Sequence, residues 1–558
     1  MKIPMDGRNH GAGLNSSSPC ATAGGRCSIN KGGCVSNNSC GSNSCGNVYV
    51  PMSFCWTVKV FGDNPKIVQR FKKFVKNLVV VMIIIMTTTG FTYSNNVQKV
   101  PDYIEEDILK GNIKLEDKTH VNLKSKISQE EYEKTIKDVE NYLKENHVIF
   151  NNTSREEFSA ECEKFIRVKK EHTIVDTILD LKVLGSSLKQ GHLGFGTGYF
   201  TEKLPVDLIL LKDGYYIKKC DKQDSNMLES KLLAINNTPI EGVEEKVSKY
   251  FLGENKNISR VFSTENIRIV DNLRRENIVN GNEITLKLEK NGKIFYKSVI
   301  PQNFRKWEFG KLNTKNTDFY FMNKAKILDR INNQNSVSIK PIDVINQTEK
   351  NFYSEIKNKD LIIYYNSCLD NAEFNIFDFS KEINKKLYES KPSTIVIDLR
   401  FNRGGSTDIY PYILKEMSLY QIKNPKTKIK VLISNNSYSA TAYATIQTMR
   451  IMDNIEVIGS DSGFTIKNTT GSDSKLYVKS LKLYCNYGSE IYKQNYEKED
   501  VFKHNYKNYD YKNDMLTPDF HAEQSFADYM IGNDPAMNYA LRDEGDSSLI
   551  NKIKQIFK

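Results

Sequence analysis

The stretch "TIVIDLRFNRGGSTDIY", residues 394–410, begins as an apolar, β-branched segment and ends as a polar loop. Its first part has the composition of a buried strand in a parallel sheet. A simple connection after a strand needs one turn residue, whereas this loop contains Arg400, Asn402, Gly404 and Gly405. Functional groups of α/β proteins gather at the carboxyl ends of parallel strands. We therefore interpret the loop as part of a binding or catalytic site.

Strand-like and helical segments alternate around this stretch. The segments "LIIYYN", "IKVLIS" and "IEVIGS" are short, apolar and β-branched, whereas "FSKEINKKLYESK" and "TAYATIQTMR" have helical spacing. This alternation predicts a mainly parallel sheet layered with helices. We assign residues 306–558 to this α/β core.

Two regions of different periodicity precede the core. Between residues 96 and 200, apolar residues recur three and four positions apart, and Ser154 followed by Glu157 resembles a capping box, so we predict a helical domain. Between residues 201 and 305 the period shortens, and Asp-Gly, Asn-Asn and Asn-Gly pairs separate strand-like segments. The second region therefore predicts a β-rich module with one or two helices.

The first 60 residues are rich in Gly, Ser and Asn and contain six of the ten cysteines. They have too few apolar residues for an ordinary core, so we expect residues 1–60 to form a disordered leader. A cross-linked or modified cysteine-rich peptide and a metal-binding segment are the alternatives, although the absence of a CxxC pair disfavours zinc. The isolated cysteines further on are expected to be small apolar core residues: Cys162, Cys220, Cys368 and Cys485.

Residues 61–95 combine a basic flank, an apolar run from Leu78 to Met86 and a small polar exit, which is typical of a signal sequence. The run is shorter than the roughly 20 residues that cross a bilayer comfortably. We expect a secretory signal or an uncleaved anchor, with membrane association through residues 74–93 and an extracytoplasmic location for the remainder. A buried strand or short helix is the alternative.

The net charge gives little reason to expect a nucleic-acid partner. It is +11, from 79 basic and 68 acidic residues that are interleaved along the chain. Because no long basic block carries aromatic spacing, we predict that nucleic acid is not a ligand.

A second strand end carries a serine where a helix should begin. In "VLISNNSYSATAYATIQTMR" the strand ends near Ser434, and Ser439 precedes the helical segment. A helix start presents free backbone N–H groups, and glycines at the neighbouring strand end allow another N–H to approach closely. These features suit a nucleophile with a two-donor oxyanion site. The alternative for Ser439 is a simple helix N-cap.

A nucleophilic serine also needs a base. Of the seven histidines, His192 lies in the glycine-rich bend "LKQGHLGFGTGYF", and the other six have polar neighbours in the sequence that predict surface positions. His192 is therefore the candidate base, with a hydrogen-bonded structural histidine as the alternative.

Taken in order, these segments resemble the tail-specific, or C-terminal processing, proteases, which are related to the tricorn protease core. "VIDLRFNRGGS" resembles the family motif "IDLR-x-N-x-GG", "SYSATAYA" its serine segment, and "LKQGHLGF" the "D-x-H-T" segment of the branch with a histidine base. "LLAINNTPIEGV" resembles part of the PDZ-like insert, and "LTPDF" and "DYMIGNDPAMNYAL" the closing pieces. The resemblance covers about residues 100–541. It implies a crotonase- or ClpP-like α/β core with an N-terminal helical domain and a PDZ-like module.

The resemblance also implies roles for individual residues. Ser439 would be the nucleophile and His192 the general base. Backbone N–H groups of Ala440 and of Gly404 or Gly405 would bind the oxyanion. Two side chains would brace the site without reacting, namely Arg400 and Asn402.

The sequence departs from the family pattern at several positions. Gln190 stands where an Asp often precedes the histidine, and Phe464 occupies the position of the base in the Ser/Lys branch. Lys467 follows three residues later and is the alternative base. No carboxylate that would orient His192 is identifiable from the sequence, and the candidates are Asp514, Asp519 and Asp461.

The expected function is that of a serine endopeptidase. It would act outside the cytoplasmic membrane on peptide or protein substrates, through an acyl-enzyme, without a metal or organic cofactor. A catalytically inactive relative that binds peptides or acts as a scaffold is the alternative.

Overall fold

The computed structural model describes residues 115–117, 122–146, 149–151, 153–195, 201–251, 253–303, 307–309, 336–339, 350–370, 374–465, 469–492, 509–510 and 515–542. The predicted leader and signal segment, residues 1–60 and 61–95, lie outside this part of the chain. Within the described ranges, no helix is both long and apolar enough to cross a membrane.

The central element is a six-stranded sheet whose strands follow one another in chain order. The strands are β15 (Phe352–Lys357), β16 (Asp360–Tyr365), β17 (Thr394–Asp398), β18 (Lys428–Ile433), β19 (Ile455–Gly459) and β24 (Phe520–His521). β15 pairs antiparallel with β16, and every other pair is parallel. The predicted, mainly parallel sheet is confirmed.

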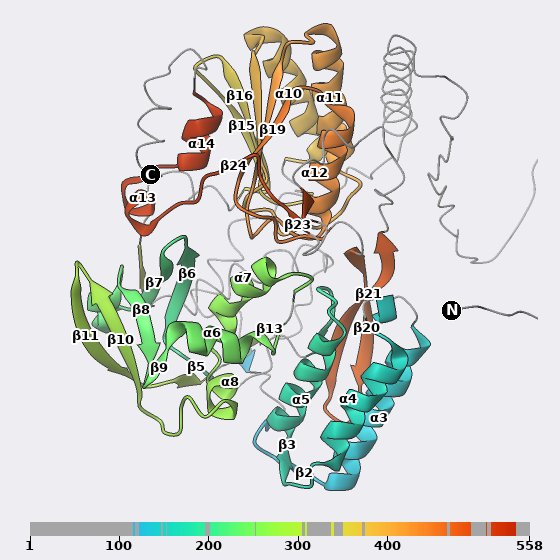
Figure 1. The fold of residues 1–558 in the computed structure, drawn as a ribbon, viewed down its shortest axis with the longest axis vertical. Helices are drawn as coiled ribbons and strands as arrows, with labels where there is room; N and C mark the ends of the chain where they lie inside the picture. Colours follow the sequence, from blue (N-terminus) through green and yellow to red (C-terminus); the bar gives the residue numbers. More distant parts are fainter. Residues whose placement is uncertain are drawn as a thin grey trace, which may run out of the picture. The chain divides into compact units, whose positions relative to one another are not determined.

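Helices cover both faces of this sheet (Figure 1). α10 (Ile376–Ser390), α11 (Tyr410–Lys423) and α12 (Ala440–Ile451) connect successive parallel strands and share one apolar core with the sheet. α14 (Pro535–Ala540) packs on the opposite face, and α13 (Phe526–Ile531) precedes it. Because strand side chains alternate between faces, Ile397 contributes to the first core and its neighbour Val396 to the second.

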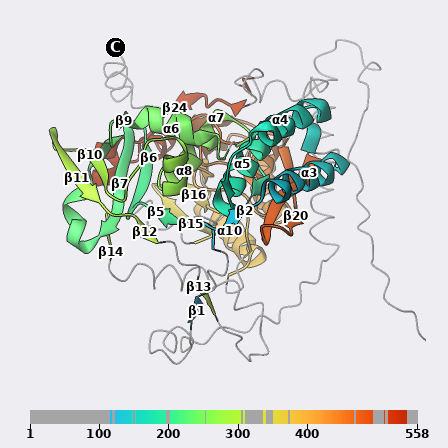
Figure 2. The same ribbon diagram turned by 90° about the horizontal axis from the view of Figure 1, so that it is seen from below.

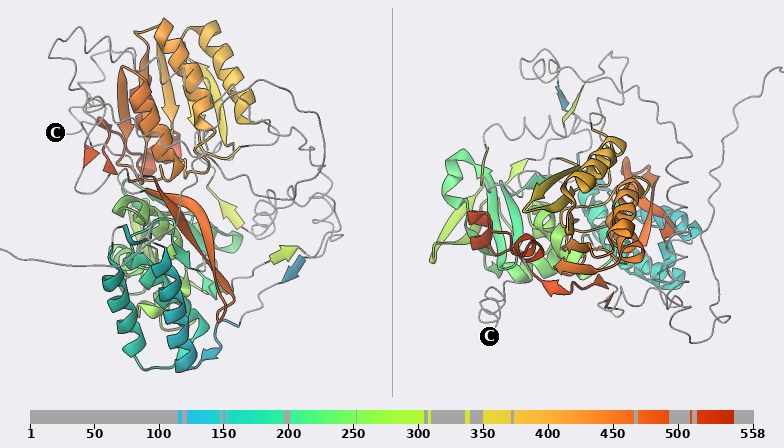
Figure 3. Two further views of the ribbon diagram at one scale, coloured as in Figure 1. Left: turned by 90° about the vertical axis from the view of Figure 1, so that its right-hand side faces the viewer. Right: turned by 90° about the horizontal axis from the view of Figure 1, so that it is seen from above.

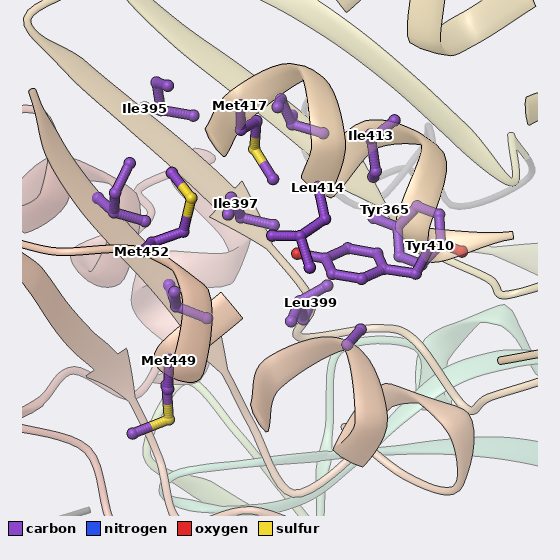
Figure 4. Packing of buried hydrophobic residues seen from close by; sticks show 14 of the residues in the cluster. Tyr365, Ile395, Ile397, Leu399, Tyr410, Ile413, Leu414, Met417, Met449 and Met452 are labelled. Atoms are coloured by element: carbon purple, nitrogen blue, oxygen red, sulfur yellow. The ribbon is translucent and has the colours of Figure 1, made fainter. Parts of the chain in front are cut away.

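The larger core continues to the end of β17. Ile395, Ile397 and Leu399 are fully buried against Leu414 and Met417 of α11 (Figure 4). Burial on both faces explains why the strand has an unbroken apolar sequence. The polar loop that follows therefore begins from a rigidly packed strand end.

A second apolar core joins helices to a distant hairpin. α3 (Gln129–Glu145), α4 (Arg155–Arg167) and α5 (Ile174–Ser187) pack with β20 (Thr469–Val478) and β21 (Leu483–Tyr492). This hairpin lies beside the helices in Figure 3. β21 also pairs with β4 (Gly194–Phe195), which follows His192 in the chain. The helices and the Ser154–Glu157 capping box are confirmed. The position of this hairpin was not predicted from the sequence.

A third core lies between a seven-stranded sheet and three helices (Figure 2). The strands are β6 (Val206–Leu211), β7 (Gly214–Asp221), β8 (Lys231–Ile235), β9 (Thr238–Pro239), β10 (Ile284–Lys290), β11 (Lys293–Val299) and β14 (Ser336–Ser338). The helices are α6 (Ile240–Ser248), α7 (Lys256–Asn266) and α8 (Val270–Arg275). The Asn-Gly turn is confirmed, since Asn291 and Gly292 connect β10 and β11 with φ of 51° and 72°.

Short elements complete the described structure. β1 (Leu115–Asp117) pairs with β13 (Trp307–Phe309), β2 (Lys126–Ile127) with β3 (His172–Thr173), β5 (Glu202–Lys203) with β12 (Gln302–Asn303), and β22 (Tyr509–Asp510) with β23 (Met515–Leu516). Two 3₁₀ turns are η1 (Ile149–Asn151) and η2 (Lys222–Met227). Cys162, Cys220, Cys368 and Cys485 are buried free thiols, which confirms their prediction as core residues.

An ion-pair network fixes the end of β17 to α14. Arg400 donates two hydrogen bonds of 2.7 Å to the carboxylate of Asp534 and also contacts Asp398 at 2.6 Å. Asp534 in turn caps α14 by accepting from the Met537 N–H. Burial alone would raise the pKa of Asp534, but the Arg400 charge and these hydrogen bonds hold it below its usual range.

This network predicts an acid-sensitive contribution to stability. Asp534→Asn keeps the helix cap but removes one charge from a buried pair, so we expect a loss of about 3 kcal/mol at neutral pH. Because the native pKa is lowered, the contribution of Asp534 is fully present above a pH of about 4 and is lost as the pH falls through the lowered value. Denaturant unfolding of both proteins between pH 7 and pH 2.5 measures this. A difference that stays constant down to pH 2.5 would contradict it.

Candidate active site

The glycine loop after β17 is held by the buried side chain of Asn402. Its Nδ2 donates to the Tyr365 carbonyl at 2.9 Å, and its Oδ1 accepts from the Gly404 N–H at 2.8 Å. The backbone carbonyl of Asn402 accepts from the Tyr438 N–H at 3.0 Å and from the Thr441 hydroxyl at 2.8 Å. One residue therefore connects the ends of β16 and β17 with the loop that enters α12.

The two glycines differ in what their N–H groups can bind. The Gly404 N–H is occupied by Asn402, whereas the Gly405 N–H has no acceptor among the described residues. Both glycines have left-handed backbone angles, with φ of 101° and 133°. A Cβ on Gly404 would lie 2.5 Å from the Cβ of Ser439, and one on Gly405 would lie 2.4 Å from the Cys368 carbonyl oxygen. Only glycine permits this close approach.

Ser439 is not an ordinary N-cap. It occupies the N-cap position of α12, yet its side chain makes no capping hydrogen bond, and its φ and ψ are 57° and −123°. A non-glycine residue with positive φ is strained, and such strain is concentrated at functional sites. The adjacent Ala440 N–H begins the helix and has no helical acceptor. The Ser439 hydroxyl thus lies beside a backbone donor for which the described residues provide no acceptor.

His192 faces this serine. Its Nε2 lies 2.8 Å from Ser439 Oγ, although the two residues are 247 positions apart in the chain. Its side chain is 13% exposed, so it is partly open to solvent. The ring also stacks on Tyr438, with centroids 5.4 Å apart. The contact brings together the two residues that the sequence nominated as nucleophile and base.

Glu254 lies on the other side of the imidazole. The sequence did not predict it as the carboxylate that orients His192. Its Oε1 is 3.4 Å from His192 Nδ1, and its side chain is 3% exposed. Oε1 is buried and accepts no hydrogen bond from the described residues, while Oε2 accepts from the Thr465 hydroxyl at 3.1 Å. A proton on Nδ1 would therefore face the carboxylate and leave Nε2 free to accept from Ser439.

Gly191 makes room for this carboxylate. A Cβ at this position would lie 2.7 Å from Glu254 Cγ and 2.0 Å from the hydroxyl of Tyr438. That hydroxyl is itself 3.5 Å from His192 Nδ1. A glycine at this position was the one feature of the sequence that could have indicated the close packing of a further group beside His192.

The carboxylates proposed from the sequence take other places or lie outside the described residues. Asp519 accepts from the Val457 N–H at 2.9 Å, at the start of the edge strand. Among the described residues, the carboxylate paired with His192 belongs to Glu254 and not to Asp461. Asp514 and Lys467 lie outside the described residues. The position of the base in the Ser/Lys branch is occupied by Phe464, which is fully buried.

The surroundings of Arg400, Asn402 and His172 are also defined. Arg400 and Asn402 both brace the loop, through the ion-pair network and the hydrogen bonds described above. The surface position predicted for His172 was wrong, because this ring is 1% exposed and stacks on Tyr132 with centroids 3.6 Å apart. In the described part of the chain, no three His, Cys, Asp or Glu side chains gather in a way that could hold a metal ion.

This arrangement provides the groups needed for acyl transfer. A hydroxyl contacts an imidazole, and the imidazole faces a buried carboxylate. At the adjacent helix start and glycine loop lie two backbone N–H groups that have no acceptor in the described part of the chain. A general base within about 3 Å of a hydroxyl can accept its proton during attack on a carbonyl. Backbone donors can stabilise the resulting oxyanion.

Comparisons with known proteins give distant similarities. No family model and no curated protein matches the sequence. Among solved structures, the photosystem II D1 C-terminal processing protease is 9% identical, with a TM-score of 0.31, over 70% of this chain and 92% of that protein. The tricorn protease is 13% identical, with a TM-score of 0.31, over 76% of this chain but 37% of its own length. A Bacteroides fragilis protein provisionally described as an S41 protease is 11% identical, with a TM-score of 0.25, over 65% of this chain and 85% of its own.

Similarities at this level do not assign the chain to a family. The structures that resemble it include C-terminal processing proteases, but both identity and TM-score are low. The chemistry proposed below is therefore derived from the distances, burial and hydrogen bonds of the site itself.

The packing at Gly404 predicts that a single methyl group disrupts the site. In Gly404→Ala the added Cβ would displace Ser439, and misplacement by about 1 Å typically costs about 10²-fold in rate. We expect the rate at which a fluorophosphonate labels Ser439 to fall by at least this factor. Gly242→Ala is the matched control, since a Cβ there meets only an ordinary contact at 3.5 Å. Equal rates of labelling in the two variants would refute the close packing of Gly404 against Ser439.

Proposed function

We propose that this chain is a serine peptidase of the tail-specific type that hydrolyses peptide bonds through an acyl-enzyme. The observation that carries the proposal is the 2.8 Å contact between Ser439 Oγ and His192 Nε2. A serine at a strained helix start, without a capping role and hydrogen-bonded to a partly exposed histidine, has the features of an activated nucleophile.

In the proposed first step, Ser439 Oγ attacks the carbonyl carbon of the scissile peptide bond. His192 Nε2 takes the hydroxyl proton as the new C–O bond forms. Glu254 holds the imidazole in the productive tautomer and stabilises the positive charge that develops on it. The buried position of the carboxylate strengthens this electrostatic effect.

The negative charge on the carbonyl oxygen would be bound by the N–H groups of Ala440 and Gly405. We favour Gly405 over Gly404 because the Gly404 N–H already donates to Asn402 Oδ1. The donors belong to backbone that is fixed by α12 and by Asn402, so little reorganisation is needed when the charge appears.

In the second half of the reaction, His192 returns its proton to the leaving amine, and the peptide bond breaks. A water molecule then attacks the acyl carbon and gives a proton to His192. As the bond between that carbon and Ser439 Oγ breaks, His192 returns the proton to Oγ, and the acid product leaves. These steps require no metal or organic cofactor.

The surrounding regions would serve substrate binding. We propose that residues 201–305 form a PDZ-like module that pairs with an extended peptide, and that residues 96–200 form a helical domain beside the α/β core of residues 306–558. We also propose that the enzyme acts outside the cytoplasmic membrane, as the sequence of residues 61–95 suggests. Mass spectrometry of the mature amino terminus tests this location.

The assignment of nucleophile and base is tested by removing each side chain. Ser439→Ala and His192→Ala should each lower peptide cleavage by roughly 10⁴-fold or more while leaving the melting temperature nearly unchanged. Labelling by a fluorophosphonate should be lost in Ser439→Ala and strongly reduced in His192→Ala.

The control for the base is Lys467→Gln, which should label and cleave like the wild type. Loss of labelling in Lys467→Gln but not in His192→Ala would transfer the role of base to the lysine. Absence of labelling and cleavage in the wild type would instead favour a peptide-binding relative without catalysis.

The role of Glu254 is tested by an isosteric change. Glu254→Gln keeps the shape of the side chain but removes its charge, so we expect kcat to fall by roughly 10²- to 10⁴-fold with little change in KM. The measurement is steady-state cleavage of a peptide pool, with thermal unfolding as a check of folding. Asp461→Asn is the matched control and should retain its kcat. An equal kcat for Glu254→Gln and the wild type would remove Glu254 from the mechanism.

A further inference from the structure

A pocket of about 300 Å³ lies next to the candidate active site. Leu193 and Gly194, which follow His192 directly, form part of its wall. Phe262 forms another part and packs edge-on against Tyr438, the residue before Ser439, with centroids 6.2 Å apart. The pocket wall therefore includes the residues that follow the base in the chain and a ring that packs on the residue before the nucleophile.

The walls of the pocket are largely aromatic or aliphatic, but its charged groups are mostly cationic. Lys182, Lys203 and Arg268 line it, together with one acidic residue, Glu265. Arg268 is already paired with Glu265, at 2.9 Å, and with Asp207. Among the described residues, no hydrogen bond or ion pair joins either lysine to an acidic side chain of the pocket lining.

Lys182 is the strongest indication that the pocket binds an anion. It is 8% exposed, and neither a hydrogen bond nor an ion pair joins its ammonium to any described residue. Burial lowers its pKa to about 8, against the opposing effect of Asp271. The Asp271 carboxylate is engaged elsewhere, since it accepts from the N–H and the hydroxyl of Thr201. A buried cation without a partner is costly, and an incoming anion would relieve that cost.

Lys203 adds a second positive charge to the same pocket. It is half-buried, and burial and the nearby Arg268 charge lower its pKa. The charges of Asp207 and Glu265 act in the opposite direction without restoring the pKa to its usual value, so a bound anion would stabilise the positive charge further. Beside the two lysines, Phe195, Tyr250 and Phe251 offer apolar surface for the alkyl or aromatic part of a ligand.

We propose that this pocket is a substrate subsite that receives a carboxylate of the bound peptide. The carboxylate would contact Lys182 and Lys203, and the atoms that carry it would pack on the aromatic wall. This inference rests on the proposed peptidase function, because the position beside Ser439 and His192 makes the ligand part of the substrate. The same chemistry is offered by an acidic side chain and by the free carboxyl terminus of a peptide.

The two sources are distinguished with matched peptide pools. Fluorescent, amino-terminally capped decapeptide pools would carry Glu or Gln at one fixed internal position, each with a free carboxyl or a carboxamide at the carboxyl terminus. Binding to Ser439→Ala protein is measured by fluorescence anisotropy, so that no turnover is needed. Cleavage by the wild type is followed in parallel by mass spectrometry.

We expect one carboxylate form to bind roughly tenfold or more tightly than its neutral counterpart, which is the effect of one charge-assisted hydrogen bond. Preference for Glu over Gln would identify a side-chain subsite, and preference for the free carboxyl over the carboxamide would identify a terminus subsite. Lys182→Met should abolish the preference without weakening the binding of the neutral pools. Lys182→Arg should retain part of it.

Two further variants keep the proposal testable if Lys182→Met does not fold. Lys203→Met changes the second lysine, which is less buried, and should reduce the preference severalfold. Lys256→Met changes an exposed lysine of α7 outside the pocket lining and should leave the preference intact. Equal binding of carboxylate and neutral pools, or a preference that survives in both Lys182→Met and Lys203→Met, would overturn the proposal.

The outcomes separate this inference from the proposed function. Cleavage that depends on Ser439 but shows no carboxylate preference would overturn the subsite and leave the peptidase standing. A carboxylate preference that depends on Lys182, without cleavage of any pool, would support the subsite and overturn the peptidase.

Discussion

The buried amide of Asn402 is the interaction on which the site depends. It satisfies a carbonyl at the end of β16 and an N–H of the glycine loop, while its backbone carbonyl receives the loop that leads into α12. The residue is fully buried, so each of these groups would be left unpaired if the amide were absent. Asn402 thereby holds the carboxyl ends of β16, β17 and β18 in fixed positions relative to one another. The glycine loop and Ser439 lie next to each other as a result.

This fixed relation makes the strain at Ser439 tolerable. A positive φ at a non-glycine residue costs of order 1–3 kcal/mol and persists only where the surrounding structure determines it. The packed core beneath β17 and α12 holds the backbone of Ser439 in this conformation. Gly404, which has no side chain, leaves the space that the serine needs. On the other face of the sheet, Arg400 and Asp534 fix the same strand end to α14. Rigid backbone on both sides leaves the hydroxyl aimed at His192.

The parts of the site that could be predicted from the sequence are those formed by a few consecutive residues. The change from an apolar strand to "RFNRGG", and a serine at a helix start, reflect backbone requirements that can be recognised within a few residues. Glu254 escaped prediction because its place depends on how the segment between α6 and α7 packs on the glycine-rich bend. Nothing near Glu254 in the sequence marks it, and only Gly191 indicated that a neighbour must approach closely. The choice between Gly404 and Gly405 likewise depends on one side-chain hydrogen bond, which composition does not reveal.

The central claim is that a hydroxyl, an imidazole and two backbone donors meet around one reacting carbonyl. A crystal structure of the protein after reaction with a peptidyl phosphonate tests this most directly. The account predicts that phosphorus is bonded to Ser439 Oγ, with its free oxygen accepting from the N–H groups of Ala440 and Gly405 and with His192 Nε2 beside the ester oxygen. Phosphorus on another residue, or a free oxygen turned away from both donors, would contradict it.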